Sequence, residues 1–262
     1  SRGEDGLWRS VLALLEQVLS SGGLDGVDAL HILEDDAELS PLFCRWVADL
    51  EPGRVAPGLD VLFTDMYAGP TVYPRRQQFF AEAVAENRLR WMAGTEYTGC
   101  LSSWLIPSER VATVLDQLRQ AYGQPRRIPI DNQLRQLLID GALQGAVSVP
   151  FMTSIDLASQ DVSAIQDQSD RAVVATRRIA DLLRRQLSVL GDPSELRPLL
   201  PLLADLVPPD RLSTHLGDLI EAVQQECWFR YPYDARLLDQ ADNPQASGPQ
   251  TASALDRSAS GL

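Results

Sequence analysis

Three adjacent carboxylates, Glu34, Asp35 and Asp36, follow directly on the apolar run Ala29-Leu-His-Ile-Leu33. Such a run is typical of a buried strand, and in an α/β sheet ligands bind beyond the carboxyl ends of the strands. Mg²⁺ or Mn²⁺ takes one or two carboxylates from a protein and fills its other positions with water and phosphate oxygens. The triplet therefore predicts a divalent-metal site for a nucleoside diphosphate. An alternative is that Asp35 and Asp36 begin a helix, whose dipole favours negative charge there.

The basic residues exclude several kinds of chemistry. All 23 are arginines, so a pyridoxal Schiff base, a Walker-type phosphate lysine and a lysine base are ruled out. The net charge of −13 argues against nucleic acid as the main partner, because nucleic-acid-binding proteins carry a basic face.

The three cysteines, Cys44, Cys100 and Cys227, are far apart and form no C-x-x-C pair. Their number and spacing predict neither a zinc site nor a disulfide framework, which fits a reducing cytoplasm. The longest apolar candidate, residues 199–207, is interrupted by Pro201 and Asp205 and is too short to span a membrane. The sequence thus predicts a soluble, cytoplasmic protein.

Helices and strands alternate in the first part of the chain. Apolar spacing predicts a helix over residues 7–20, a strand over 27–33, a helix over about 37–50 and a strand over 59–64. A third strand over 99–106 precedes a helix whose apolar face holds Val111, Val114, Leu115 and Leu118, and a short strand over 145–150 follows. Alternation of this kind indicates an α/β fold with a mostly parallel sheet flanked by helices.

The remainder of the chain has a different composition. Residues 67–94 are expected to form an insertion over the site. From about residue 168 the pattern is helical only, with helices expected over 172–190 and 211–228, whereas 239–262 lacks apolar periodicity. We therefore expect an α/β domain over 1–165, a helical extension over 166–238 and a disordered tail over 239–262.

Several short motifs occur in the order of a known family. They are Leu7-Trp8, Ile32-Leu-Glu-Asp-Asp-Ala-Glu-Leu39, Asp60-Val-Leu-Phe63, Cys100-Leu-Ser-Ser-Trp-Leu-Ile-Pro107, Pro129-Ile-Asp131, and Val149-Pro150 with Ser163-Ala-Ile165. This order resembles glycosyltransferase family 25, the lipopolysaccharide-biosynthesis and collagen-type galactosyltransferases, over roughly the first 165 residues. The family normally begins with a strand that nothing before Leu7 supplies, so we expect the nucleotide-binding part to be incomplete.

The resemblance implies a GT-A-like fold and a metal-dependent hexosyl transfer from a nucleotide sugar to a glycan or another hydroxyl acceptor. Glu34, Asp35 and Asp36 would then hold Mn²⁺ or Mg²⁺ against the donor's diphosphate. If the reaction inverts, Asp131 is the first candidate for the base that deprotonates the acceptor, and Asp65 is the second. A helix cap is the alternative role of Asp131, and a solvated loop position is that of Asp65.

Four other polar or aromatic residues lie near these motifs. Ser102 and Ser103 are candidates to bind sugar hydroxyls, or they face solvent. His31 is interpreted as a core histidine with its hydrogen bonds satisfied. Trp104 would stack on a sugar ring or belong to the core.

Two other functional classes remain open. A non-catalytic glycosyltransferase-like module would use its helical half to bind a partner, and nucleotide-sugar binding would separate it from the enzyme. A haloacid-dehalogenase-like phosphohydrolase needs Asp-x-Asp and a later lysine, whereas this chain has Glu-Asp-Asp and no lysine.

Overall fold

The computed structural model describes residues 2–40, 43, 58–69, 76, 79, 80, 82, 83, 89–157 and 171–188. The fold is mixed α/β, as the sequence predicts. The helices are α1 (Arg2–Ser20), η1 (Gly94–Glu96), η2 (Ser108–Arg110), α5 (Val111–Tyr122), α6 (Ile130–Ile139) and α7 (Arg171–Leu187). The strands are β1 (Ala29–Leu33), β2 (Ala37–Leu39), β3 (Val61–Phe63), β4 (Arg90–Ala93), β5 (Ser103–Pro107), β6 (Gly145–Val149) and β7 (Thr153–Ile155).

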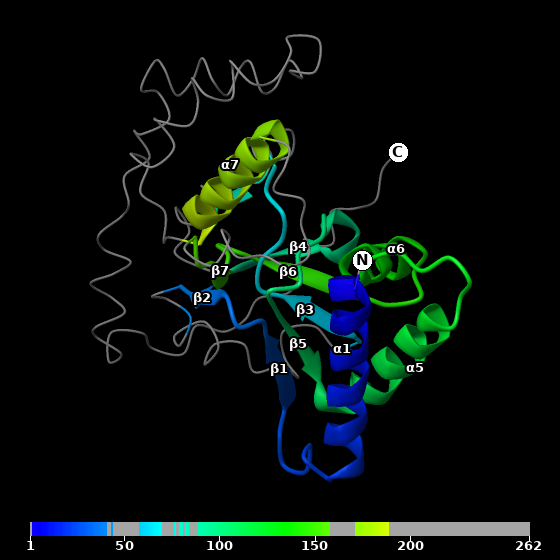
Figure 1. Cartoon of the computed structure of the whole chain (residues 1–262). Helices are drawn as coiled ribbons and strands as arrows, with labels where there is room; N and C mark the ends of the chain where they lie inside the picture. Colours follow the sequence, from blue (N-terminus) through cyan, green and yellow to red (C-terminus); the bar gives the residue numbers. More distant parts are fainter. Residues whose placement is uncertain are drawn as a thin grey trace, which may run out of the picture.

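The main sheet has the strand order β1-β5-β3-β6-β4 (Figure 1). The prediction of a mostly parallel sheet is wrong for the part of the chain that the structure describes, because β3 and β6 are its one parallel pair. Strand β5 enters antiparallel between β1 and β3. A strand buried on both faces has the same apolar pattern whichever way its neighbours run, so composition alone did not reveal the direction.

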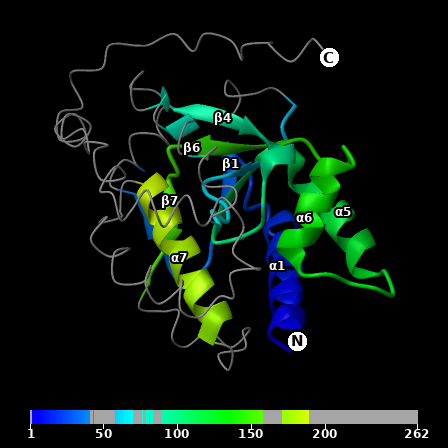
Figure 2. The same ribbon diagram turned by 90° about the horizontal axis from the view of Figure 1, so that it is seen from above.

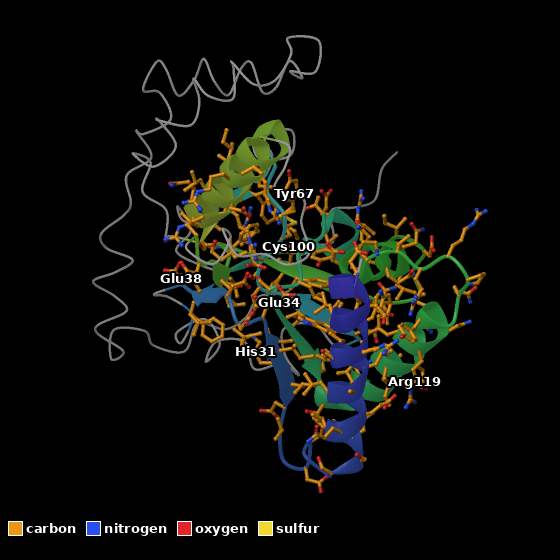
Figure 3. The ribbon with its side chains drawn as sticks, in the orientation of Figure 1. His31, Glu34, Glu38, Tyr67, Cys100 and Arg119 are labelled. Atoms are coloured by element: carbon orange, nitrogen blue, oxygen red, sulfur yellow. The ribbon has the colours of Figure 1, made fainter. Side chains whose placement is uncertain are left out.

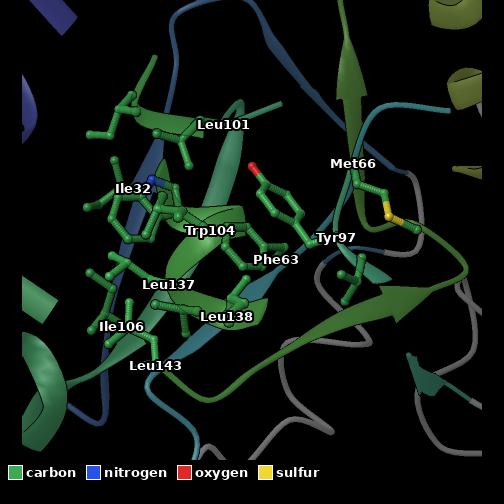
Figure 4. Close-up of a cluster of buried hydrophobic side chains, with 14 of the residues drawn as sticks. Ile32, Phe63, Met66, Tyr97, Leu101, Trp104, Ile106, Leu137, Leu138 and Leu143 are labelled. Carbon is green, nitrogen blue, oxygen red and sulfur yellow. The ribbon is translucent and has the colours of Figure 1, made fainter. Parts of the chain in front are cut away.

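Both faces of the sheet centre are buried. Val61 and Phe63 of β3 contribute to a large core cluster with Trp104 and Ile106, whereas Leu62 lies in a second cluster with Leu105, Ala146 and Met152. This division follows from the two-residue period of a strand, which sends successive side chains to opposite faces. In the larger cluster, Phe63 stacks on Tyr97 with ring centroids 3.8 Å apart (Figure 4).

Helices α1, α5 and α6 lie close together, and α7 lies away from them, next to β7 (Figures 1 and 2). Helix α1 buries Trp8, Val11, Leu12 and Leu15, which share one face at the helical period. Leu14 of the same helix is exposed, whereas the indole N–H of buried Trp8 donates to the carbonyl of Ile128 at 3.0 Å. The apolar face predicted for α5 is confirmed, since all four residues are buried.

The helix predicted over 37–50 is contradicted at its beginning. Residues Ala37–Leu39 form β2, which pairs antiparallel with Thr153–Ile155 of β7. The cause is a non-local backbone ladder more than 100 residues away in sequence, which local periodicity does not report. The insertion expected over 67–94 is wrong at its end, because Arg90–Ala93 form β4, which pairs antiparallel with β6 in the main sheet. Most of residues 41–50, most of 70–88, the helix expected over 211–228 and the tail over 239–262 lie outside the described residues.

Helix α7 packs beyond the carboxyl ends of the parallel pair. The amide of Phe151, two residues after β6, donates to the carbonyl of Leu187 at 2.7 Å. Ile179, Leu182 and Leu183 of α7 belong to the same large core cluster as the sheet and α1. The predicted helix over 172–190 is thus confirmed over 171–187, and it lies at the end of the sheet where the acidic residues cluster.

Candidate active site

The acidic triplet forms the turn that carries the chain from one sheet to the other. The amide of Ala37 donates to the carbonyl of Glu34 at 3.1 Å, which closes the turn between β1 and β2. The amide of Glu34 donates to the carbonyl of Ser102 at 2.7 Å, and the carbonyl of Asp36 accepts the amide of Asp156 at 2.8 Å. The alternative that Asp35 and Asp36 begin a helix is therefore wrong. Backbone hydrogen bonds fix the turn at both ends, so the positions from which its side chains extend are defined.

The three carboxylates differ in exposure. Glu34 and Asp36 are half-buried, whereas Asp35 at the tip of the turn is exposed. In Figure 3, Glu34 and Cys100 lie between the end of β1 and α7. Of the three carboxylates, Asp35 is thus the one most accessible to solvent.

Asp131 comes to the same place from the start of α6. Its Oδ1 accepts the amide of Asn132 at 2.8 Å, and its Oδ2 accepts the amide of Cys100 at 3.4 Å. The cap position of α6 is held by Pro129, and no side chain caps it, so the helix-cap alternative for Asp131 is wrong. Asp131 instead holds the turn at Gly99 and Cys100, whose φ values of 106° and 81° lie in the left-handed region. This turn is also the reason that β5 begins at Ser103 rather than at the predicted residue 99.

Asp65 follows β3 and is fully buried. Its two carboxylate oxygens accept the hydroxyl of Ser102 at 2.9 Å, and Oδ2 accepts Nε and Nη2 of Arg184 at 3.1 and 2.5 Å. The expectation of a solvated loop position is therefore wrong. A carboxylate held in this way suits a positioning role better than exchange of a proton with a bound acceptor.

The pKa of Glu34 shows how closely these carboxylates approach one another. Burial and the negative charges of Asp36, Asp65 and Asp131 raise its pKa from 4.5 to about 7, against the opposing effect of Arg184. Residues from four separate segments therefore share one electrostatic environment. The acidic turn, Asp65 and Asp131 thus lie within electrostatic reach of one another.

This pKa shift gives a prediction about stability. Folded Glu34 keeps its proton up to about pH 7, whereas the unfolded chain releases it near pH 4.5, so the free energy of unfolding should fall as the pH rises through that window. The loss should be on the order of 2–3 kcal/mol. Glu34→Gln removes this titration and should be more stable than the wild type at pH 8, by about that amount. Urea unfolding of both proteins at pH 5 and pH 8 in metal-free buffer tests it, and an identical pH dependence in the two would contradict it.

The carboxylates of the acidic turn suit a cation whose other ligands are water and phosphate oxygens. Among the described residues, no group of three or more His, Cys, Asp and Glu side chains is arranged to hold a metal ion by itself. Glu34 and Asp36 supply two carboxylates whose mutual repulsion a cation would relieve. Two carboxylates with water and phosphate oxygens are the usual surroundings of Mg²⁺, so the turn fits a metal that arrives with a diphosphate and does not form a closed protein cage.

The hydroxyls of Ser102 and Ser103 have partners inside the protein. Ser102 is buried and donates to Asp65, while Ser103 is buried and lies 2.8 Å from Nε2 of His31. The alternative that these serines face solvent is therefore wrong. Their proposed contact with sugar hydroxyls stays a prediction, and Ser102 also fixes the turn through its carbonyl.

Trp104 is a core residue, whereas His31 is only half-buried. His31 stacks on Phe43 with ring centroids 5.3 Å apart, and burial lowers its pKa, so the ring is neutral. Trp104 is fully buried, and its ring stacks on Phe63 at 6.5 Å (Figure 4).

Arg184 is a site residue that is not among those predicted from the sequence. It is fully buried, and its guanidinium contacts Asp65, the hydroxyl of Ser102 and, at 2.9 Å, Sγ of Cys100. One signal was present: Arg184 lies within the apolar stripe of a predicted helix, where a charged residue needs a buried partner.

Comparisons with protein-family models, with curated proteins and with solved structures give no match to this chain. Within the described residues, no helix combines the length and the apolar composition needed to cross a bilayer. The function is therefore argued from the geometry of the site.

Proposed function

We propose that the protein is a metal-dependent glycosyltransferase that moves a hexose from a nucleotide sugar to a glycan or another hydroxyl acceptor. The observation that carries the proposal is the convergence of Glu34 and Asp36 with Asp131 at one end of the sheet. Two carboxylates are available for a cation, and a third, from another element, lies within electrostatic reach of them. A GT-A-like, family-25-like domain is the fold that this proposal implies.

The acidic turn serves the donor. Glu34 and Asp36 would hold Mn²⁺ or Mg²⁺, whose positive charge offsets the charge that develops on the departing nucleoside diphosphate. Asp35, which is exposed, attracts the metal cation at longer range. The turn is tied by its backbone to Ser102 and Asp156, so the two ligands keep their positions when the donor leaves.

Asp131 serves the acceptor. Its carboxylate removes the proton from the acceptor hydroxyl, that oxygen bonds to the anomeric carbon, and the bond from this carbon to the diphosphate oxygen breaks with its electron pair leaving on the diphosphate. The amides of Cys100 and Asn132 donate to the two carboxylate oxygens of Asp131 and fix the direction of its carboxylate before the acceptor arrives. This inverting route predicts a product with the opposite anomeric configuration to the donor.

A thermal-shift panel of nucleotide sugars with and without Mn²⁺ is the first test. At a donor concentration of 100 times Kd, binding should add about 2.7 kcal/mol to stability, seen as a rise in Tm that disappears with EDTA. Donors that raise Tm are then incubated with hydroxyl acceptors, and release of nucleoside diphosphate and the product's anomeric configuration are measured.

Three outcomes separate the functional classes. Metal-dependent donor binding with transfer supports the enzyme. Absence of any nucleotide-sugar binding refutes the proposal and favours a non-catalytic module that binds a partner. Hydrolysis of simple phosphate monoesters without glycosyl transfer favours the phosphohydrolase.

A further inference from the structure

Helix α7 contributes a buried arginine to the centre of the candidate site. Arg184 is fully buried and forms an ion pair with Asp65, which is also fully buried. Its guanidinium contacts the end of β3 through Asp65 and the residues before β5 through Ser102 and Cys100. A planar group with five N–H donors is suited to joining three acceptors in fixed directions.

The turn at Cys100 connects this arginine to Asp131. Burial raises the pKa of Cys100 to about 12, so its thiol is neutral and accepts the Nη1–H of Arg184. The amide of the same residue donates to Asp131, and its carbonyl accepts the hydroxyl of Tyr97 at 2.5 Å. Since the amide of Tyr67 also donates to the carbonyl of Gly99 at 2.9 Å, the turn is held from several sides. Arg184 connects the Cys100 turn to α7.

The acidic turn depends less on Arg184. Glu34 is tied to the carbonyl of Ser102, which continues the paired ladder of β1 and β5. That ladder fixes Glu34 whatever occupies the position of Arg184. Asp131 lies in the first turn of α6 and not in a strand ladder, and its side chain contacts the Cys100 turn at 3.4 Å.

We infer that Arg184 is a positioning residue that acts through the Cys100 turn to set Asp131, and that α7 is thereby part of the acceptor side of the site. This inference rests on the proposed function for its catalytic consequence. The alternative is that Arg184 acts only as the counter-ion of Asp65.

Arg184→Lys separates the two views. Lysine keeps the positive charge beside Asp65, which protects the fold, but its single ammonium cannot replace three directed contacts. We expect kcat to fall by about 10- to 100-fold, the size typical of residues that orient a functional group, with the donor Kd within about threefold of wild type. Arg178→Lys is the matched control, because Arg178 lies on the same helix and donates to the carbonyl of Leu157 at 2.8 Å, away from Asp131.

A double-variant cycle tests the route of action. If Arg184 acts through Asp131, Arg184→Lys with Asp131→Asn should be no slower than Asp131→Asn alone. Losses that multiply would overturn the inference, as would a wild-type kcat in Arg184→Lys. A counter-ion of purely structural importance would lower Tm and leave the kcat of the folded molecules unchanged.

Hydrogen exchange gives an answer that does not depend on turnover. In Arg184→Lys, the amides of residues 97–102 should exchange about tenfold faster than in wild type, while those of α5 stay unchanged. Unchanged exchange over 97–102 would overturn the inference. If the wild type neither binds nor transfers a nucleotide sugar, the proposed function fails, and this measurement still decides whether Arg184 sets the turn.

Discussion

Asp36→Asn should lose Mn²⁺-dependent binding of a nucleoside diphosphate, with an affinity at least about 100-fold weaker than that of wild type. Asparagine offers the metal a neutral oxygen in place of a carboxylate, and the site has only Glu34 left to supply charge from the buried side of the turn. The fold should persist, because the carbonyl of Asp36, not its side chain, accepts the amide of Asp156. Isothermal titration calorimetry with and without Mn²⁺ measures the effect.

Asp35→Asn is the matched control for this experiment. It makes the same chemical change one residue away, but Asp35 is exposed and is not among the groups that shift the pKa of Glu34. Its affinity should stay within a few-fold of wild type. An unchanged affinity in Asp36→Asn would remove the acidic turn as the metal site, whereas equal losses in both variants would mean that the turn acts only through its net charge.

Asp131→Asn should lower kcat by about 10²- to 10⁴-fold while the donor Kd stays near that of wild type. A base acts only as the acceptor reacts, so its loss appears in turnover and not in ground-state donor binding. The structure makes the substitution a mild one, since the amide oxygen of asparagine can still accept the amide of Cys100. Steady-state kinetics with donor and acceptor varied separately, together with donor titration by calorimetry, measures both quantities.

The carboxylate of Asp140, at the other end of α6, provides the control for the helix itself. It accepts Nε2 of Gln136 at 2.8 Å near the surface, so Asp140→Asn should leave kcat unchanged. Wild-type turnover in Asp131→Asn would show that this residue serves only to hold the Cys100 turn. Another group would then have to accept the proton.

Much of the local structure was predictable from the sequence. Burial follows apolar periodicity closely in α5, and the strands at 29–33 and 61–63 lie within the predicted limits. The acidic residues that follow these strands were recognisable as site candidates because ligands of α/β sheets bind beyond the carboxyl ends of the strands.

The direction and pairing of the strands were not predictable in the same way. Strand β5 pairs with β1 across more than 70 residues of sequence, and β2 pairs with β7 across more than 110. Such pairings are selected by the packing of whole elements, and the apolar pattern of a buried strand is equally compatible with parallel and antiparallel neighbours. For that reason the parallel sheet and the helix at 37–39 were predicted wrongly.

The sequence by itself determined which segments are apolar enough to be buried and which carboxylates stand at their ends. Only the tertiary structure decided that Asp65 is neutralised by Arg184, that Asp131 holds the Cys100 turn, and that Asp35 points away from the site. The physical reason is that apolar periodicity along a short segment is enough to predict which residues are buried. A buried charge, in contrast, needs a partner to offset the cost of its desolvation, and that partner can be any group that the fold brings near.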